Sequence, residues 1–168
     1  GKEFLLWTRG KANYKTHREL VTKCDKHAEK IIFSHIRKYF PEYAILSEES
    51  GLLNKKSDYF WVVDPLDGTS NFTNHIPMFT SSISLFYKNE VVLGVTYMPL
   101  LDEMYYATKG NGFYKNNKKL SVSKIKDLKK GVISYNHGKG IANTKKAYKI
   151  YEHFHLNAFR CRNIYSTT

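Results

Sequence analysis

Largely apolar residues recur at helical spacing in two segments of the chain. Between Asp25 and Pro41 they lie three and four positions apart, as on one face of an amphipathic helix, at Ala28, Ile31, Ile32, His35, Ile36 and Tyr39. Asp25 is a candidate N-cap for this helix, and Pro41 would end it. Residues 143–154 show a second amphipathic pattern, and residues 1–8 resemble part of a further helix.

Other apolar runs are short and rich in β-branched and aromatic residues, which predicts strands. They cover residues 43–47, 59–63, 79–87, 91–98, 103–108 and 131–135. Lys88-Asn89-Glu90 predicts a hairpin turn between two of them, and Gly110 and Gly112 mark the next turn. A helix, then consecutive strands, then another helix favours an α+β fold, with helices packed on a mainly antiparallel sheet.

No internal repeat or low-complexity linker interrupts residues 1–168, so the sequence predicts a single domain. The first helical pattern begins midway, and residues 159–168 read like the start of another element. We therefore expect a chain that is shortened at both ends. No apolar run approaches the ~18 residues needed to cross a bilayer, so no membrane association is expected. Two cysteines, Cys24 and Cys161, make no disulfide framework, which favours the cytoplasm.

The chain has a strong excess of positive charge, which bears on its possible binding partners. The chain has 22 lysines and 5 arginines against 15 acids, for a net charge of +12. Such an excess can attract nucleic acid, an anionic membrane or a phosphorylated substrate. The densest stretch, residues 109–130, holds eight lysines and one acid, Asp127, but no stacking aromatic motif organises them. A solvated lysine-rich surface is therefore the preferred interpretation, ahead of a nucleic-acid site.

The candidate chemistry begins after the apolar strand that includes Trp61 and Val63. The segment that follows is Asp64-Pro65-Leu66-Asp67-Gly68. Pro65 restricts Asp64 to an extended backbone, so Asp64 and Asp67 can converge on one cation with the Leu66 carbonyl between them. Gly68 permits a sharp turn, after which Thr69-Ser70-Asn71 can open a short helix. The free N–H groups of that helix would face an anion.

A second acidic pair, Glu48-Glu49, ends another short strand. In an extended chain the two side chains point to opposite sides, so one can bind a metal ion while the other serves a water or a second ion. Glu48, Asp64 and Asp67 form an all-oxygen ligand set, which suits Mg²⁺ or Mn²⁺ and not zinc. Asp25 could orient a threonine hydroxyl.

Each of these features also has a structural interpretation. Asp-Pro-x-Asp-Gly alone is typical of a turn, Glu48-Glu49 alone of an exposed surface, and Asp25 alone of a helix cap. Their joint occurrence, each after an apolar segment, favours a catalytic site. His75 is better explained as a loop or packing residue than as a metal ligand. Cys24 is better explained as a small packing residue than as a nucleophile.

The run from Asp64 to Phe72 resembles the metal-binding motif of the inositol monophosphatase family. Further segments follow in the family's order, namely residues 20–25, 47–50 (Ser-Glu-Glu-Ser), 75–77 (His-Ile-Pro), 94–97 (Gly-Val-Thr-Tyr) and 103–123. The resemblance covers nearly the whole chain. It implies the N-terminal part of the family's layered α+β sandwich, with a C-terminal subdomain missing. It also implies a homodimer and inhibition by lithium.

The resemblance also implies roles for individual residues. Two or three Mg²⁺ ions, which Mn²⁺ could replace, would be held by Glu48, Asp64, Asp67 and the Leu66 carbonyl. Glu49 and Thr69 would position or deprotonate the attacking water, with Asp25 hydrogen-bonded to Thr69. The substrate would be bound by the segment Leu66, Asp67, Gly68 and Thr69, with the backbone N–H groups of Gly68 and Thr69 holding the phosphate. Arg162 resembles an arginine near the family's substrate side, although the residues after it depart from the family's small Gly-Ser/Thr-Ala-Ala run.

The family also carries a further carboxylate in a Trp-Asp pair, which this chain lacks; its tryptophans are Trp7 and Trp61. We therefore expect the chain alone to be poorly active. The predicted function is Mg²⁺-dependent hydrolysis of a phosphate monoester, foremost inositol monophosphate, by a metal-activated water. The alternative is a family member without catalytic activity that acts as a basic nucleic-acid or protein-binding module.

Overall fold

A computed structural model describes residues 13–16, 19–21, 23–53, 57–135 and 141–162. By its internal contacts the chain divides into two compact units, Gly1–Leu120 and Ser121–Thr168. A single domain over residues 1–168 stays a prediction. The helix expected over residues 1–8 lies outside the described residues.

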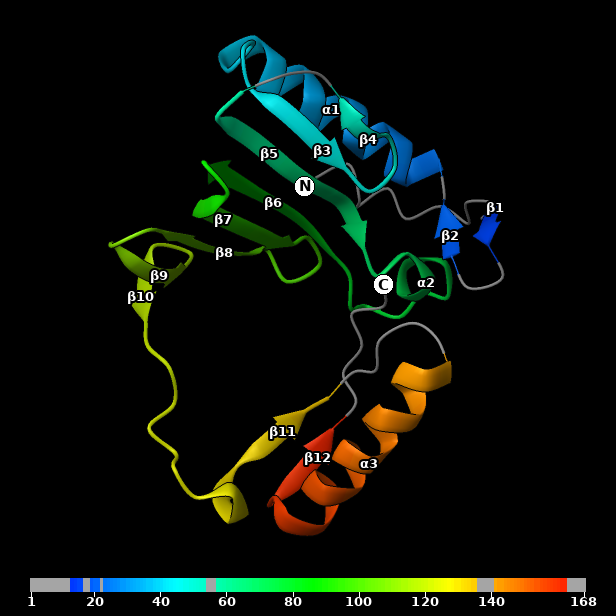
Figure 1. Ribbon diagram of the computed structural model, residues 1–168, viewed down its shortest axis with the longest axis vertical. Helices are drawn as coiled ribbons and strands as arrows, with labels where there is room; N and C mark the ends of the chain where they lie inside the picture. Colours follow the sequence, from blue (N-terminus) through cyan, green and yellow to red (C-terminus); the bar gives the residue numbers. More distant parts are fainter. Residues whose placement is uncertain (1–12, 17–18, 22, 54–56, 136–140, 163–168) are drawn as a thin grey trace. The chain divides into compact units, whose positions relative to one another are not determined.

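An eight-stranded sheet forms most of the first unit, with strand order β10-β9-β8-β7-β6-β5-β3-β4 (Figure 1). All neighbouring strands are antiparallel except β3 and β5, which run in the same direction. This confirms the α+β class with a mainly antiparallel sheet. The strands are β3 (Ala44–Ser47), β4 (Gly51–Leu53), β5 (Tyr59–Asp67), β6 (Thr80–Tyr87), β7 (Glu90–Met98), β8 (Glu103–Thr108), β9 (Gly112–Lys115) and β10 (Lys118–Leu120).

Helix α1 (Lys23–Tyr39) packs against this sheet through its apolar stripe. Phe33 and Ile36 are buried with the side chains of Ile45, Trp61 and Val63, which come from β3 and β5. Every second residue of these strands faces the helix, as expected of a half-buried sheet. This core fixes α1 and the two parallel strands to one another, and all three lead to the site described below.

Asp25 is not the N-cap that the sequence suggested. It is the third residue of α1 and is 1% exposed. An N-cap carboxylate stays at the helix end and accepts an N–H group of the first turn. Asp25 instead faces a residue 44 positions later in the chain, a contact that the local pattern could not reveal.

Strand β5 continues four residues past the predicted end at Val63. The pairing of β5 with β6 shifts register between Asp64 and Asp67. Proline lacks an N–H donor and is tolerated where a ladder is irregular, so Pro65 does not end the strand. The acidic segment therefore belongs to the sheet itself and not to a loop after it.

Two tight hairpin turns join β6 to β7 and β9 to β10. Lys88 and Asn89 both have positive φ between β6 and β7, as do Asn116 and Asn117 between β9 and β10. Positive φ at both central residues is the geometry that matches the twist of two paired strands. The first hairpin confirms the predicted turn. The strands β4, β9 and β10 were not predicted.

The remaining described elements are short, except for one helix. In the first unit they are the hairpin of β1 (Asn13–Thr16) with β2 (Glu19–Val21) and the helix α2 (Thr69–Thr73). The second unit contains a 3₁₀ turn (Leu128–Lys130), the parallel pair β11 (Val132–Ser134) and β12 (Arg160–Arg162), and helix α3 (Ile141–Asn157). The predicted helix over 143–154 and the strand over 131–135 are thus confirmed with shifted bounds.

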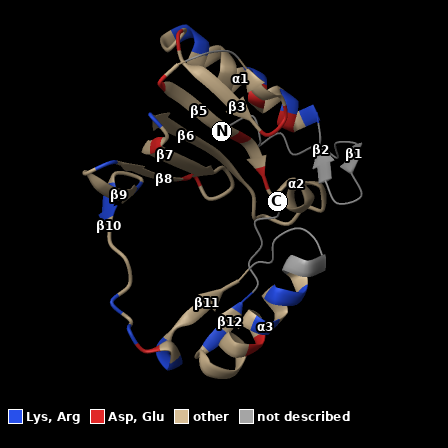
Figure 2. Cartoon of the chain, in the orientation of Figure 1, with Lys and Arg blue, Asp and Glu red and all other residues tan. Residues whose placement is uncertain are grey.

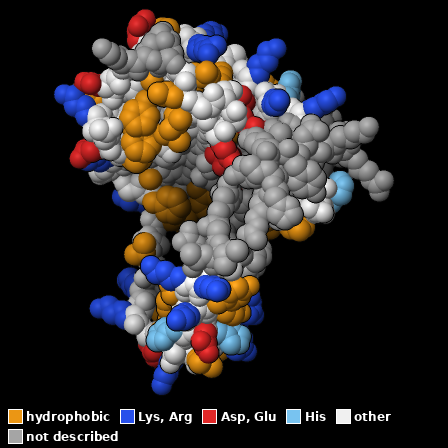
Figure 3. Space-filling model, turned by 45° about the vertical axis from the view of Figure 1, so that its right-hand side comes forward, with side chains coloured by type: hydrophobic (Ala, Val, Ile, Leu, Met, Phe, Trp, Pro, Cys, Tyr) orange, Lys and Arg blue, Asp and Glu red, His pale blue; other side chains and the backbone are white. Residues whose placement is uncertain are grey.

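Lysine and arginine side chains are spread over the visible surface in Figure 3, with apolar patches between them. Exposed apolar side chains on the first unit include Leu46, Leu52 and Phe113. Over the part of the chain that the structure describes, no helix combines the length and the apolar character needed to span a membrane.

Candidate active site

The acidic end of β5 turns sharply into helix α2 at Gly68. Its φ of 89° lies in the left-handed region, where glycine is favoured. A Cβ built on Gly68 would lie 3.0 Å from the carbonyl oxygen of Met78 and 3.3 Å from Phe79. Both the backbone angle and the close approach therefore require glycine here. The turn brings Thr69, the first residue of α2, back beside Leu66.

Thr69 connects this turn to helix α1. Its hydroxyl lies 3.1 Å from Oδ1 of Asp25 and 3.1 Å from the carbonyl oxygen of Leu66. The single hydroxyl proton is thus shared between a buried carboxylate and a carbonyl at the strand end. The contact between Asp25 and Thr69 that the family resemblance implies is present, and its catalytic role stays a prediction.

Glu48 and Glu49 lie in a turn, and not at the end of an extended strand as expected. β3 ends at Ser47, and β4 begins at Gly51, whose φ is 70°. The Glu48 N–H donates to the carbonyl oxygen of Val63, 3.2 Å away on β5. The turn arises because β3 and β4 are antiparallel neighbours, so the chain reverses within the acidic pair.

The electrostatics of Asp64 show that these segments meet. The pKa of Asp64 is raised from 3.8 to about 7, foremost by burial. The negative charges of Glu48 and Asp67, and then of Asp25, raise this pKa further, while a backbone hydrogen bond from Leu66 lowers it. Figure 2 shows the acidic positions along β5 and at the end of β3, near α2. Four carboxylates from three segments therefore share one region.

One carboxylate oxygen in this region lacks a partner. Within the described part of the chain, the buried Oδ1 of Asp64 accepts no hydrogen bond. A buried carboxylate oxygen without a partner is unfavourable in a folded protein unless a cation or a water completes it. The oxygen donors of Glu48, Asp64, Asp67 and the Leu66 carbonyl are the type that Mg²⁺ prefers, so the residues fit such an ion.

The described carboxylates do not form a compact metal-binding cluster. Among the residues that the structure describes, no group of three or more His, Cys, Asp or Glu side chains lies close enough to hold an ion. The metal role of Glu48, Asp64 and Asp67 thus stays a prediction.

Comparison with known proteins assigns the chain. A model of the inositol monophosphatase family matches residues 4–168. The chain belongs to the inositol monophosphatase family. It is 41% identical over 128 residues to the inositol monophosphatase of Dictyostelium discoideum, a match over 74% of this chain and 47% of that relative. It is 42% identical over 115 residues to the Nus factor SuhB of Pasteurella multocida, which covers 68% of this chain and 43% of that relative.

Solved structures of the inositol monophosphatase family have the same fold. The Thermotoga maritima inositol monophosphatase superposes with a TM-score of 0.86 at 32% identity, over 99% of this chain and 63% of that one. The chain spans about half the length of the curated relatives it matches.

Arg162, the remaining predicted substrate residue, lies in the second unit of this family member. It is exposed at the end of β12, and its guanidinium donates to the Cys161 carbonyl oxygen 3.1 Å away. Its contact with substrate stays a prediction. Cys161 and Cys24, both among the described residues, are thiols and are not joined in a disulfide.

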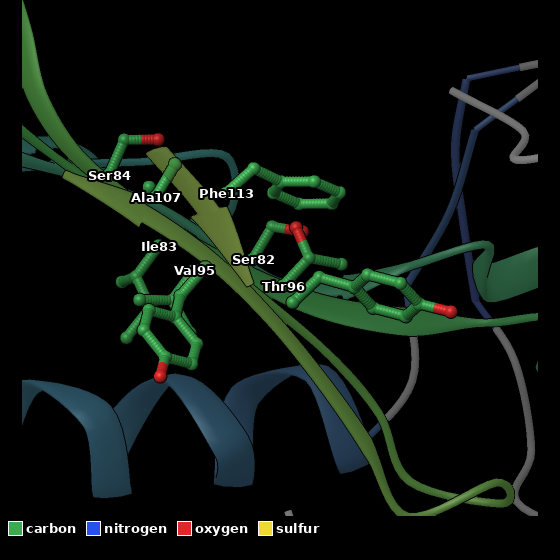
Figure 4. A pocket seen from close by; sticks show the side chains of 10 residues that line it. Ser82, Ile83, Ser84, Val95, Thr96, Ala107 and Phe113 are labelled. Carbon is green, nitrogen blue, oxygen red and sulfur yellow. The ribbon is translucent and has the colours of Figure 1, made fainter. Parts of the chain in front are cut away.

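A cavity of about 240 Å³ lies on the sheet formed by β6 to β9. Figure 4 shows small polar and aromatic side chains around it. The residues that line it are Ser82, Ile83, Ser84, Gly94, Val95, Thr96, Tyr105, Tyr106, Ala107 and Phe113. The described lining contains no carboxylate, although Ser82, which lines the cavity, pairs with Asp64 across β5 and β6.

Sequence reasoning missed the buried polar residues whose hydrogen bonds hold the turns next to the acidic residues. Buried Asn71 donates to the carbonyl oxygen of Met78, at 2.6 Å, and closes the turn after α2. Buried Glu29 accepts hydrogen bonds from Ser47 and Ser50. One sequence signal could have found Glu29, because it lies on the apolar face of α1, where the pattern calls for a hydrophobic residue.

Proposed function

We propose that the protein containing this chain hydrolyses a phosphate monoester in a Mg²⁺-dependent reaction. The observation that carries the proposal is the buried, unpartnered Oδ1 of Asp64 among the carboxylates of Glu48, Asp67 and Asp25. An acidic region of this kind needs cations before it can accept an anionic phosphate.

The metal ligands would be Glu48, Asp64, Asp67 and the carbonyl oxygen of Leu66, for two or three Mg²⁺ ions or for Mn²⁺ in their place. When bound, such ions lower the pKa of a water molecule and stabilise the negative charge on the leaving oxygen. The tight turn at Gly68 and the buried Leu66 hold the ligands of β5 in place.

Thr69 and Asp25 would direct the attacking water. A hydroxyl that donates to the Asp25 carboxylate is left with lone pairs that can accept a hydrogen bond from water. A proton leaving that water can pass to Thr69 while the Thr69 proton moves toward Asp25. Glu49 would act as a further base or orienting group, and the N–H groups of Gly68 and Thr69 would face the phosphate. Arg162 would contact the substrate.

Inositol monophosphate is the proposed substrate. The motif from Asp64 to Phe72 supports this branch of the family, as does the Dictyostelium relative named inositol monophosphatase. By the same resemblance we propose inhibition by lithium and a homodimer. A cytoplasmic location is proposed because Cys24 and Cys161 make no disulfide framework. Because the chain spans about half of its curated relatives, these proposals concern the whole protein.

A catalytically inactive binding module is the second candidate. The net charge of +12 favours it, and so does similarity to a relative named Nus factor SuhB. Electrostatic binding to nucleic acid would weaken steeply as salt is added, since counterions are released on binding. The intact acidic set argues for catalysis, because a binding module has no use for an oxygen cluster of this kind.

The test is phosphate release from myo-inositol 1-phosphate by the full-length gene product, with and without Mg²⁺. Asp67→Asn should abolish turnover if Asp67 holds metal. Asp58→Asn is the matched control, because Asp58 is exposed and pairs only loosely with Lys88, at 3.9 Å. Turnover that persists in Asp67→Asn would contradict the metal role. Absence of turnover on inositol, sugar and nucleotide phosphates, with salt-sensitive RNA binding, would favour the binding module.

A further inference from the structure

Glu29 is a buried carboxylate that the proposed reaction does not use. It is 8% exposed and lies on the face of α1 that packs against the sheet. Both of its oxygens accept hydrogen bonds: Oε1 from the Ser47 hydroxyl at 2.5 Å, and Oε2 from the Ser50 hydroxyl at 2.6 Å. Hydrogen bonds to a charged acceptor are short and strong, as these are.

The two serines lie on either side of Glu48 and Glu49. Ser47 is the last residue of β3 and is 3% exposed, and Ser50 precedes the first residue of β4. Because both hydroxyls reach the same carboxylate, both ends of the acidic turn are held against α1. The bond from the Glu48 N–H to Val63 fixes the turn to β5 as well.

Asp25 holds the other acidic segment in the same manner. It precedes Glu29 by four residues, so the two carboxylates lie one helical turn apart on one face of α1. Asp25 accepts a hydrogen bond from Thr69, the first residue of α2, just after β5. Glu29 accepts hydrogen bonds from the two serines that flank the turn after β3. One helix thus connects to both segments that carry the proposed metal ligands.

Packing alone does not account for a carboxylate at this position. Apart from Asp25, the other buried positions of α1 are apolar, at Ala28, Phe33 and Ile36. A buried charge is unfavourable unless hydrogen bonds compensate it, and here the compensation comes from the two residues beside the acidic pair. The carboxylate therefore serves the conformation of the turn.

We propose that Glu29 is a positioning residue, which sets the affinity for the metal ion by holding the Glu48-Glu49 turn through Ser47 and Ser50. The proposal rests on the proposed function, because it assumes that this turn supplies metal ligands. Groups that orient metal ligands typically change metal affinity about 10–100-fold when they are removed.

The experiment compares variants of the full-length protein by calorimetric titration with Mg²⁺ or Mn²⁺, and by the Mg²⁺ dependence of phosphate release. Glu29→Ala should raise the Kd for the metal about 10–100-fold. Ser47→Ala with Ser50→Ala should have a similar effect, and adding Glu29→Ala to that pair should change little more. Glu29→Gln should largely rescue binding, since an amide can accept from one hydroxyl and donate to the other.

Ile36→Ala is the matched control for a loss of stability. Ile36 is buried on the same helix, away from the acidic turn, so its truncation loosens the packing of α1 and leaves the metal Kd unchanged. Exchange of the Glu48 amide, measured in the absence of metal, should become faster in Glu29→Ala and not in Ile36→Ala.

The outcomes separate the two proposals. An active wild-type protein in which Glu29→Ala binds metal normally would overturn the role of Glu29 alone. Equal weakening by Glu29→Ala and Ile36→Ala would also overturn it, because the effect would then be a general loss of stability. A wild-type protein that neither binds Mg²⁺ nor releases phosphate would overturn both proposals.

Discussion

Replacing Asp64 by asparagine should stabilise the metal-free protein at pH 8. The pKa of Asp64 is about 7 in the folded chain against 3.8 ordinarily, so the folded state holds the proton more tightly than the unfolded state. The contribution of this proton to stability is therefore fully present below pH 4 and is lost as the pH rises to 7, where the folded carboxyl ionises. The asparagine side chain of the variant carries no charge and has no such dependence.

The size of the effect follows from the difference between the two pKa values. The two pKa values differ by about three, and a difference of one in pKa is worth ~1.4 kcal/mol, so the whole difference corresponds to about 4 kcal/mol of unfolding free energy. Since Asp64 is only partly buried, screening by water reduces this to about 2–3 kcal/mol. Above pH 7 the variant should be more stable than the wild type by this amount, and near pH 4 the two should be similar.

The assay is urea unfolding in EDTA from pH 4 to pH 8, followed by tryptophan fluorescence, since Trp61 is buried in the core of the first unit. Mg²⁺ at about 1,000 times its Kd should reverse the order, because it adds about 4.1 kcal/mol to a protein that binds it, more than the advantage of the variant. Asp58→Asn controls for an exposed carboxylate. The reasoning is refuted if Asp64→Asn is less stable at pH 8, or if both proteins show the same pH dependence.

Three further predictions concern the turn and the ions. Gly68→Ala should destabilise the chain by about 1–3 kcal/mol, because alanine at φ 89° would meet the Met78 carbonyl; Gly94→Ala, where a Cβ would meet no described atom within 4 Å, is the control in thermal unfolding. Thr69→Val should lower kcat about 10²–10⁴-fold, since Asp25 loses its hydroxyl donor, whereas Thr69→Ser should restore activity; equal kcat values would contradict a role in proton transfer. Lithium should inhibit phosphate release at saturating Mg²⁺, and insensitivity in an inhibition titration would count against the family analogy.

Periodic patterns predicted most of the sheet and both long helices. Residues 79–87, 91–98 and 103–108 became β6, β7 and β8 with shifts of one residue at most. Alternating burial and tight turns are local properties, so the sequence carries them directly. β9 and β10 were missed because they are only four and three residues long, and Asn116-Asn117 was not recognised as their turn.

The candidate site was predictable as a set of residues but not as an arrangement. Asp64, Asp67 and Glu48 stand out because carboxylates directly follow apolar runs. The interior position of Asp25 and the contacts of Glu29 depend on partners 44 and 18 positions away in sequence. A glutamate on a helix is usually solvated. The place of Glu29 on the apolar face of α1 marks it in the sequence, but only the tertiary structure shows the serine hydroxyls that it binds.

The parallel pairing of β3 with β5 has a consequence for the order of folding. β3 and β5 pair at a constant separation of 16 residues, from Ala44 with Phe60 to Ser47 with Val63, whereas β5 and β6 pair at separations of 13 to 28 residues, from Asp67 with Thr80 to Tyr59 with Tyr87. Contacts that close shorter loops form earlier, so we expect β3 to join β5 as early as β6 does. The carboxylates of Glu48 and Asp64 would then come together early in folding, and their repulsion would oppose the pairing of these two strands. Mg²⁺ should accordingly speed the formation of this part of the sheet, because a cation between the carboxylates would offset their repulsion.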